Sequence, residues 1–504
     1  MPDRPSENSS GSFLTHVTQL VSGNVAAQAL TVLSLPILSR LFAPQAMGLA
    51  SLFMSLTTLI GVLACLRYEL SIMLPDTDGE AANLLGVCLI TTLVVTLLTF
   101  LSLPAIEHKI LPMVSAEKLT PYLPLVPLAI LVNGFFLALN YWNSRTKHFG
   151  RLAVAKLTSA VLHNTVRLGG GFMGYVTSGI LIVSAILGQL VTTLVLGAQI
   201  VRDHRQLFRE SIRIPHMVAG LKRHWKFPIF SSGSMVLNTL SFQLPAWFLA
   251  FYFSPEIVGY FALCRLVLGM PMTLIGMSVT QVFFQRASEA ATGGEDMTRV
   301  VSGVFRRLVA MGLFPFLLLT LIGNDMFGFI FGAPWREAGV FAQILSMAIF
   351  AQFISSPLTT MFAVMEKQGI HLMMDIFLFG TRLAALIIGG MRGDVKLALL
   401  LYAGAGIAYY VLFHLWLVVA LKMPWTLPLK PFVTFGMIAL LPLTLPAIAK
   451  WQFALAPIWV LLAGGLGIVP YYGMVLMKDS ALKQPVQNVL NKIGRHRIRL
   501  TKVL

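Results

Sequence analysis

Ionisable side chains inside long apolar segments are the residues of this sequence best suited to do chemistry. One such segment carries Lys156, His163 and Arg167, whose spacings of seven and four residues place them on one face of a helix. Ionisable groups are costly in hydrocarbon and usually face a cavity or a partner. Because a guanidinium pairs with two phosphate oxygens at once, this face is predicted to bind an anion.

A later apolar segment repeats the pattern with His371, Asp375 and Arg382, spaced four and then seven residues apart. Arg265 lies in a third segment, so the basic residues in these segments outnumber the one clear acid by four to one. We therefore expect a positively charged cavity to which Arg167, Arg265 and Arg382 contribute. Asp375 and His371 are candidates for coupling to protons or another cation.

Structural alternatives remain open for each of these residues. Lys156 could reach the membrane interface with its long side chain, and His163 could be a packed polar residue. Asp375 could simply pair with His371 one turn away. The arginines could instead hold helices together, in which case they would not line a cavity.

The composition indicates which elements must position these groups. The chain has 504 residues, of which 57% are hydrophobic and 11% are charged, and its mean hydropathy is +0.79. A soluble domain of this size needs more charged surface, so the chain belongs to the membrane class. The net charge of +17 comes mainly from short loops and a tail, which disfavours a nucleic-acid partner.

Apolar runs of about 20 residues, the length that crosses a bilayer, predict an all-α polytopic protein with about fourteen transmembrane helices. We expect no cleaved signal peptide, because the first run is too long for a signal-peptide core. Prolines within the runs, such as Pro36, Pro245, Pro271 and Pro315, could kink helices or help them bend during transport. The predicted spans are 17–39, 45–66, 81–103, 122–142, 152–173, 176–201, 228–253, 257–284, 308–331, 338–365, 371–391, 397–421, 431–449 and 453–477.

The distribution of lysine and arginine predicts the orientation. With the N-terminus in the cytoplasm, the inner loops and tails hold 26 of these residues and the outer loops hold 7. Loops rich in Lys and Arg stay inside, so both termini are expected in the cytoplasm of an inner-membrane protein. Residues 202–227 form a basic cytoplasmic linker, expected to lie on the inner leaflet, and residues 478–504 form a basic tail.

An internal repeat divides the spans into two lobes of six helices. Pro44 and Gly48 recur as Pro255 and Gly259 at an offset of 211 residues. Arg167, with the three glycines that follow it, recurs loosely as Arg382 with two glycines. The predicted domains are an N-terminal lobe (1–201), a C-terminal lobe (228–421) and two extra helices (422–477), with any substrate bound between the lobes.

Residues 22–85 resemble the oligosaccharide flippases of the polysaccharide transporter family, within the multidrug/oligosaccharidyl-lipid/polysaccharide exporter superfamily. The resemblance rests on "LSRLFAPQAMG" at residues 38–48 and on "RYELSIMLP" at residues 67–75, followed by Glu80. It implies two MATE-like lobes around a central cavity. It also implies a polyprenyl-pyrophosphate-linked glycan as substrate, as in O-antigen or exopolysaccharide assembly. Arg67 and Glu69 are expected at a cytoplasmic helix end, in a structural or gating role.

This substrate suggests roles for the uncharged polar residues. Asn24, Gln28, Asn238 and Gln243 could provide polar walls for the sugars, while the lipid tail stays in the bilayer. Membrane lipids are expected partners, and a glycan polymerase is a candidate partner. No cofactor or metal is expected, and coupling to a proton or sodium gradient is left open.

Three alternatives remain. A drug or cation exporter of the MATE family would favour acidic groups in its cavity, and a lipid II flippase would have related chemistry. A membrane glycan polymerase or ligase is an enzyme that would usually need a sizeable external loop, whereas the outer loops here are short. Because no phosphate loop, zinc motif or nucleophile elbow is present, we expect no enzyme.

Overall fold

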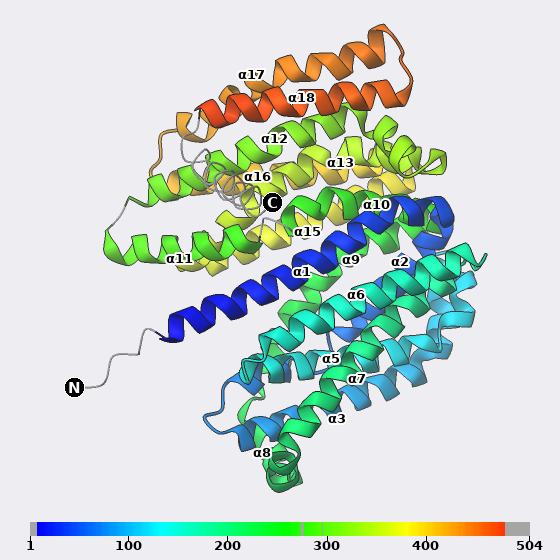
Figure 1. The fold of residues 1–504 in the computed structure, drawn as a ribbon, viewed down its shortest axis with the longest axis vertical. Helices are drawn as coiled ribbons and strands as arrows, with labels where there is room; N and C mark the ends of the chain where they lie inside the picture. The colour runs from blue at the N-terminus through cyan, green and yellow to red at the C-terminus, as the bar shows by residue number, and fades with distance from the viewer. Residues whose placement is uncertain (1–7, 274–276, 295, 479–504) are drawn as a thin grey trace, which may run out of the picture. The chain divides into compact units, whose positions relative to one another are not determined.

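The computed structural model describes residues 8–273, 277–294 and 296–478. Within these ranges the regular structure is helical, without a strand (Figure 1). The chain divides into two compact units, with the boundary between Ala262 and Leu263. The predicted basic tail falls almost entirely outside the described residues, as do the side chains of residues 8–24.

The first unit is built from long apolar helices joined by short polar turns. Helix α6 packs between α1 and α7, and α3 packs against α5. A short 3-10 helix, η1 (Tyr68–Met73), connects α2 to α3. The helices are α1 (Asn8–Leu41), α2 (Pro44–Gly61), α3 (Asp78–Ala105), α4 (Leu111–Met113), α5 (Leu125–Arg145), α6 (Phe149–Phe172), α7 (Ser178–Ser211), α8 (Ile214–Arg223), α9 (Ser232–Tyr252) and the first turns of α10 (Pro255–Pro271).

The second unit contains the rest of α10 and the remaining helices. Helix α12 packs along α13, and α15 packs along α16. The last two long helices, α17 and α18, lie side by side and also contact α12 (Figure 1). The helices are α11 (Met277–Gly293), α12 (Met297–Ile330), α13 (Arg336–Ser355), α14 (Met361–Val364), α15 (Gln368–Met391), α16 (Val395–Ala420), α17 (Thr426–Ala447) and α18 (Pro457–Lys478).

Local sequence signals explain where several helices begin. The Thr77 hydroxyl accepts a hydrogen bond from the Glu80 backbone N–H and caps α3. Asp394 caps α16 by accepting hydrogen bonds from the backbone N–H groups of two following residues. Such side chains satisfy N–H groups that the first helical turn leaves without an intrahelical acceptor. The capped helices are thereby fixed at their polar ends while their apolar bodies remain uninterrupted.

In the described part of the chain, each of the fourteen predicted spans falls mainly on helix, which confirms the all-α membrane class. Of the helical segments described, nine are long and apolar enough to cross a membrane, and the other five predicted spans lie on helices that do not meet both criteria. The eighth predicted span is divided between α10 and α11. The predicted prolines lie inside α1, α9, α10 and α12. The predicted lobe boundaries stay predictions.

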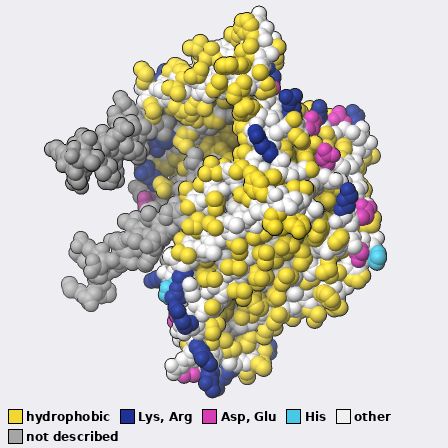
Figure 2. Space-filling view, turned by 45° about the vertical axis from the view of Figure 1, so that its right-hand side comes forward, with side chains coloured by type: hydrophobic (Ala, Val, Ile, Leu, Met, Phe, Trp, Pro, Cys, Tyr) yellow, Lys and Arg dark blue, Asp and Glu magenta, His cyan; other side chains and the backbone are white. Residues whose placement is uncertain are grey.

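Apolar side chains cover much of the helix surface. On the face drawn in Figure 2, most lysines, arginines and acids lie toward the edges of a broad hydrophobic area. A contiguous apolar surface of this extent would aggregate in water and is suited to lipid. The outward face of α3 illustrates this arrangement with Ile90, Leu93, Val94, Leu97, Leu98 and Leu101, which are all exposed.

Candidate functional site

Arg167 is held inside the first unit by two polar side chains. Its Nη2 donates to Ser34 Oγ on α1 at 2.8 Å and to Asn164 Oδ1 on α6 at 2.5 Å. Arg167 is only 8% exposed, and Ser34 and Asn164 are also buried. Its Nε has no hydrogen-bond partner among the described residues. The guanidinium is therefore held by neutral acceptors, and part of its donor capacity is left unused.

The other two predicted residues of α6 lie on the same helix face as Arg167. His163 is half-buried, and its Cβ would lie 3.3 Å from a Cβ added to Gly188 of α7, so the ring lies against that helix. Lys156 is also half-buried, two turns nearer the start of α6. The three predicted side chains thus lie along α6, from half-buried Lys156 to buried Arg167.

In the second unit, Arg382 of α15 lies against α16. Its guanidinium carbon is 4.6 Å from the centre of the Tyr402 ring, a cation–π distance. A Cβ added to Gly406 would lie 3.2 Å from Arg382 Nη2, so this glycine leaves space for the guanidinium. The buried Nε of Arg382 has no hydrogen-bond partner in the described part of the chain. An aromatic face orients this arginine while leaving donors available.

His371 and Asp375 of α15 lie together with Tyr409 of α16. The Tyr409 hydroxyl donates to Asp375 Oδ1 at 3.1 Å, and His371 Nε2 lies 3.6 Å from Asp375 Oδ2. The His371 ring stacks on Phe362 with a centroid distance of 4.6 Å. Since the Asp375 side chain is 51% exposed, this carboxylate is both positioned and accessible, as a proton or cation site requires.

Arg265 joins the same region of the second unit. It is half-buried on α10, and Arg265, Arg382 and Asp375 all act electrostatically on Tyr410 of α16. In the second unit, Arg382 and Asp375 thus contact tyrosines of α16, and His371 lies beside Asp375. Arg167, by contrast, is held by partners from its own unit.

For the predicted sugar-facing residues, the structure gives mainly their exposure. Asn238 of α9 is exposed, and Gln28 of α1 and Gln243 of α9 are half-buried. The backbone of Asn24 lies within α1, and its side chain lies outside the described part.

Sequence reasoning missed the residues that orient the arginines. Asn164 stands three residues before Arg167, and this helical spacing could have marked it as a partner. Tyr402 and Tyr409 are seven residues apart, which places them on one face of α16. Ser34 carried no comparable signal, because 133 residues separate it from Arg167.

The "RYELSIMLP" motif folds into a second polar site at the start of α3. Glu69 is 1% exposed and lies 3.1 Å from Arg67 Nη1, while Arg67 adopts a left-handed conformation with φ of 63°. Burial raises the pKa of the Glu69 carboxyl above its ordinary value, and Arg67 opposes this shift. The strained turn thus holds the Glu69 carboxyl beside the Arg67 guanidinium in the interior.

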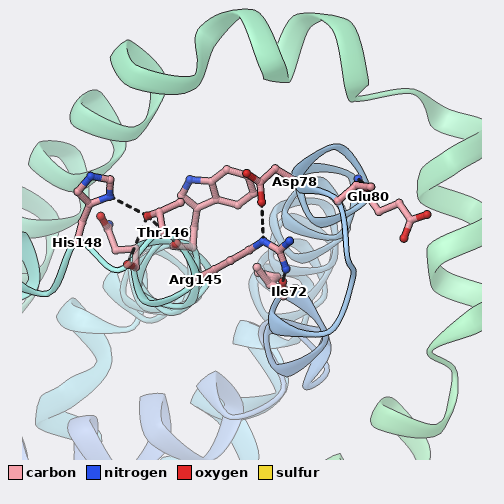
Figure 3. A network of polar contacts seen from close by, with 9 residues as sticks. Ile72, Asp78, Glu80, Arg145, Thr146 and His148 are labelled. Atoms are coloured by element: carbon pink, nitrogen blue, oxygen red, sulfur yellow. Dashed lines mark hydrogen bonds and ion pairs between the residues drawn. The ribbon is translucent and has the colours of Figure 1, made fainter. Parts of the chain in front are cut away.

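Arg145 connects this turn to the end of α5 (Figure 3). Its Nε donates to Asp78 Oδ1 at 2.9 Å, and its Nη1 donates to the Ile72 carbonyl at 3.0 Å. His148 Nδ1 lies 2.8 Å from Thr146 Oγ1 beside it, and burial lowers the pKa of His148. These contacts brace the motif, which supports the predicted structural or gating role.

Among the described residues, no group of His, Cys, Asp and Glu side chains is arranged to hold a metal ion. The three cysteines, Cys65, Cys88 and Cys264, are free and buried.

The sequence matches the model of a known protein family. A family model described as "Polysaccharide biosynthesis protein" matches residues 37–340. No curated protein matches the chain in sequence.

Solved structures of transporters share the fold. Lipid II flippase MurJ in an inward closed conformation has a TM-score of 0.72 at 14% identity, covering 93% of this chain and 99% of its own. An inward-facing multidrug resistance MATE family transporter of the MOP superfamily has a TM-score of 0.60 at 15% identity, covering 78% and 95%. A mutant of the Vibrio cholerae MATE transporter VcmN has a TM-score of 0.51 at 12% identity, covering 83% and 98%.

Proposed function

We propose, from the premise that the chain belongs to the polysaccharide biosynthesis protein family, that it flips a lipid-linked oligosaccharide across the cytoplasmic membrane. The chain is a multi-pass membrane transporter of the flippase type, not an enzyme. The specific substrate is a polyprenyl-pyrophosphate-linked O-antigen or exopolysaccharide repeat unit. It moves from the cytoplasmic to the outer leaflet by alternating access, with both termini in the cytoplasm.

One observation carries the choice of an anionic substrate. Among the described residues, none of Arg167, Arg265 and Arg382 forms an ion pair with a carboxylate, although all three lie within apolar helices. Several arginines at polar helix ends, such as Arg145, Arg151 and Arg223, do have carboxylate partners. A buried charge without a countercharge is unfavourable, so the substrate's pyrophosphate supplies the missing negative charge.

Each arginine, within its own unit, has an environment suited to a phosphate oxygen. Arg167 presents a fixed guanidinium whose position Ser34 and Asn164 determine. Arg382 is oriented by stacking on Tyr402 and retains unpaired donors. Preorganised donors of this kind bind phosphate oxygens without first reorganising. The apolar tail needs no comparable pocket, since the hydrophobic surface of the helices lies in the bilayer.

Energy coupling is proposed at Asp375. Its carboxylate accepts from Tyr409 and lies beside His371, and half of the side chain remains accessible. Binding of a proton or another monovalent cation there would change the charge next to Arg382, which lies two turns along the same helix. That change would alter the affinity for the anionic head group during each cycle.

Transport of a fluorescent lipid-linked glycan into proteoliposomes tests the proposal. Arg382→Ala should reduce flipping about ten- to a hundredfold, because losing a charge-assisted bond costs about 1.5–3 kcal/mol. Arg382→Lys should restore only part of the rate, since lysine lacks the planar fork. Arg392→Ala is the matched control, because Arg392 is exposed just beyond the end of α15 and should transport like the parent.

The same assay can refute the proposal. Full transport by well-folded alanine variants at Arg167, Arg265 and Arg382 would exclude a cationic binding site. Transport of a cationic drug, with no movement of the glycan, would favour the MATE-type alternative.

A further inference from the structure

The two copies of the repeated proline–glycine motif touch each other. Pro44 and Gly48 stand in the first turns of α2, and Pro255 and Gly259 stand in the first turns of α10. All four residues are buried, and all lie within the first compact unit. Segments that the sequence relates by an offset of 211 residues therefore meet in space.

The contact is reciprocal and made by backbone. A Cβ added to Gly48 would overlap the Pro255 carbonyl oxygen and lie 2.9 Å from the Gly259 nitrogen. A Cβ added to Gly259 would overlap the Pro44 carbonyl oxygen and lie 3.2 Å from the Gly48 nitrogen. Each glycine thus faces the other motif's proline carbonyl. This is the geometry expected at a local two-fold axis between repeats.

Only this close approach explains the two glycines. Both lie within helices and neither has a positive φ, so no unusual backbone conformation requires them. Glycine is a poorer helix former than alanine. Small residues do allow helix backbones to come together in membranes, and here any side chain would push α2 and α10 apart.

A hydrogen bond also joins α9 to α2, further along α2 than the glycine contact. Trp247 Nε1 of α9 donates to Ser55 Oγ of α2 at 2.8 Å. Ser55 lies two turns beyond Gly48 on the same helix, and it is buried. Helices α9 and α10 therefore hold α2 at two levels, first by backbone contact and then by an indole donor.

We infer that the contact between residues 44–48 and 255–259, the glycine gate, is the extracytoplasmic gate of the transport cycle. This inference rests on the proposed function and orientation, which put the connections from α1 to α2 and from α9 to α10 outside. The gate is closed in the structure and separates when the substrate leaves toward the outer leaflet. Because packed interfaces switch between discrete arrangements, a small change at this contact shifts the balance between closed and open states.

Thiol accessibility tests the gate without any substrate. Ser55→Cys places a reporter beneath the gate in a background in which the three native cysteines are replaced by serine or alanine. Because this substitution changes the acceptor of Trp247, the reporter variant itself is the reference for every comparison. In Gly48→Ala or Gly259→Ala, labelling by a membrane-impermeant maleimide added outside should rise about tenfold or more. Combining the two substitutions should add little, since both open the same contact.

Matched glycines provide the control. Gly269 lies on α10 and Gly233 on α9, and a Cβ added to either would meet nothing within 4 Å. Gly269→Ala and Gly233→Ala should therefore leave labelling at the parent level. Unchanged labelling in both gate variants, or an equal rise in the controls, would overturn the inference.

A cross-link decides the matter if the alanine variants fail to fold. Gln45 and Glu256 are exposed and occupy equivalent motif positions. The pair Gln45→Cys and Glu256→Cys, joined by a reducible bifunctional maleimide, should stop transport, and reduction should restore it. Transport at the parent rate by the cross-linked protein would overturn the gate. A gate confirmed by labelling in a protein that moves no glycan would refute only the proposed substrate.

Discussion

Removing the carboxamide of Asn164 should separate a structural role of Arg167 from a role in substrate binding. Arg167 Nη2 donates to Asn164 Oδ1 at 2.5 Å and to Ser34 Oγ at 2.8 Å, and all three residues are buried. Asn164→Ala leaves a buried guanidinium with one acceptor fewer. Losing a hydrogen bond to a charged group costs about 1.5–3 kcal/mol, so the variant should be measurably less stable.

The buried thiols provide the assay. Cys65, Cys88 and Cys264 are inaccessible in the folded protein, so a thiol-reactive dye reports unfolding as the detergent-solubilised protein is heated. At about 2 °C per kcal/mol, Asn164→Ala should lower Tm by roughly 3–6 °C. Ser34→Ala should lower it too, and the double variant should fall short of the sum, because the two acceptors share one donor.

Arg167→Ala then distinguishes the two roles. It removes the buried charge together with its donors, so Tm should fall no further than in Asn164→Ala. Glycan flipping, however, should fall much more than in Asn164→Ala, since the countercharge for the pyrophosphate is gone. An unchanged Tm in Asn164→Ala, or full flipping by Arg167→Ala, would contradict this reasoning.

Three further predictions concern pH, coupling and orientation. Because burial raises the pKa of Glu69, the fold favours its protonated form and loses stability as pH rises through that pKa. Glu69→Gln should therefore weaken the loss of Tm as pH rises above the ordinary glutamate range of about 4. A parent that is instead stabilised more than Glu69→Gln by the rise in pH would contradict the assignment. Asp375→Asn should abolish acceleration of flipping by an imposed ion gradient while leaving basal exchange measurable, and gradient-driven flipping at the parent rate would exclude Asp375. A membrane-impermeant thiol reagent added to intact cells should label a cysteine placed near Lys118 and miss one placed near Arg213. The opposite pattern of labelling would invert the proposed orientation.

The helices were predictable because length and apolarity alone define a membrane span. The fourteen predicted spans fall on helices, since neither tertiary partners nor ligands are needed to satisfy the backbone of a helix in lipid. The interruptions were less predictable. The turn at Arg67, with positive φ, depends on packing that no local pattern records.

The candidate site was predictable only in part. Charge within apolar segments identified Arg167 and Arg382, and helical spacing placed each with its neighbours on one face. The spacing could not identify their partners, because Ser34 lies on a distant helix and Tyr402 on the next one. Two arginines at similar positions in the repeat therefore have different environments, neutral acceptors for one and an aromatic face for the other.

The repeat explains why the gate and the binding groups differ in symmetry. At the glycine gate each copy must fit the other's backbone, so a larger residue in either copy breaks both halves of the contact, and Gly48 and Gly259 stay alike. An asymmetric head group imposes no such demand on Arg167 and Arg382, whose surroundings are free to diverge. On the proposed function, closure depends on the pairing of the copies, and substrate choice depends on the side chains that differ between them. Changes at Asn164 or Tyr402 should accordingly alter which glycan is moved without opening the gate, whereas changes at either glycine should open it whatever the cargo.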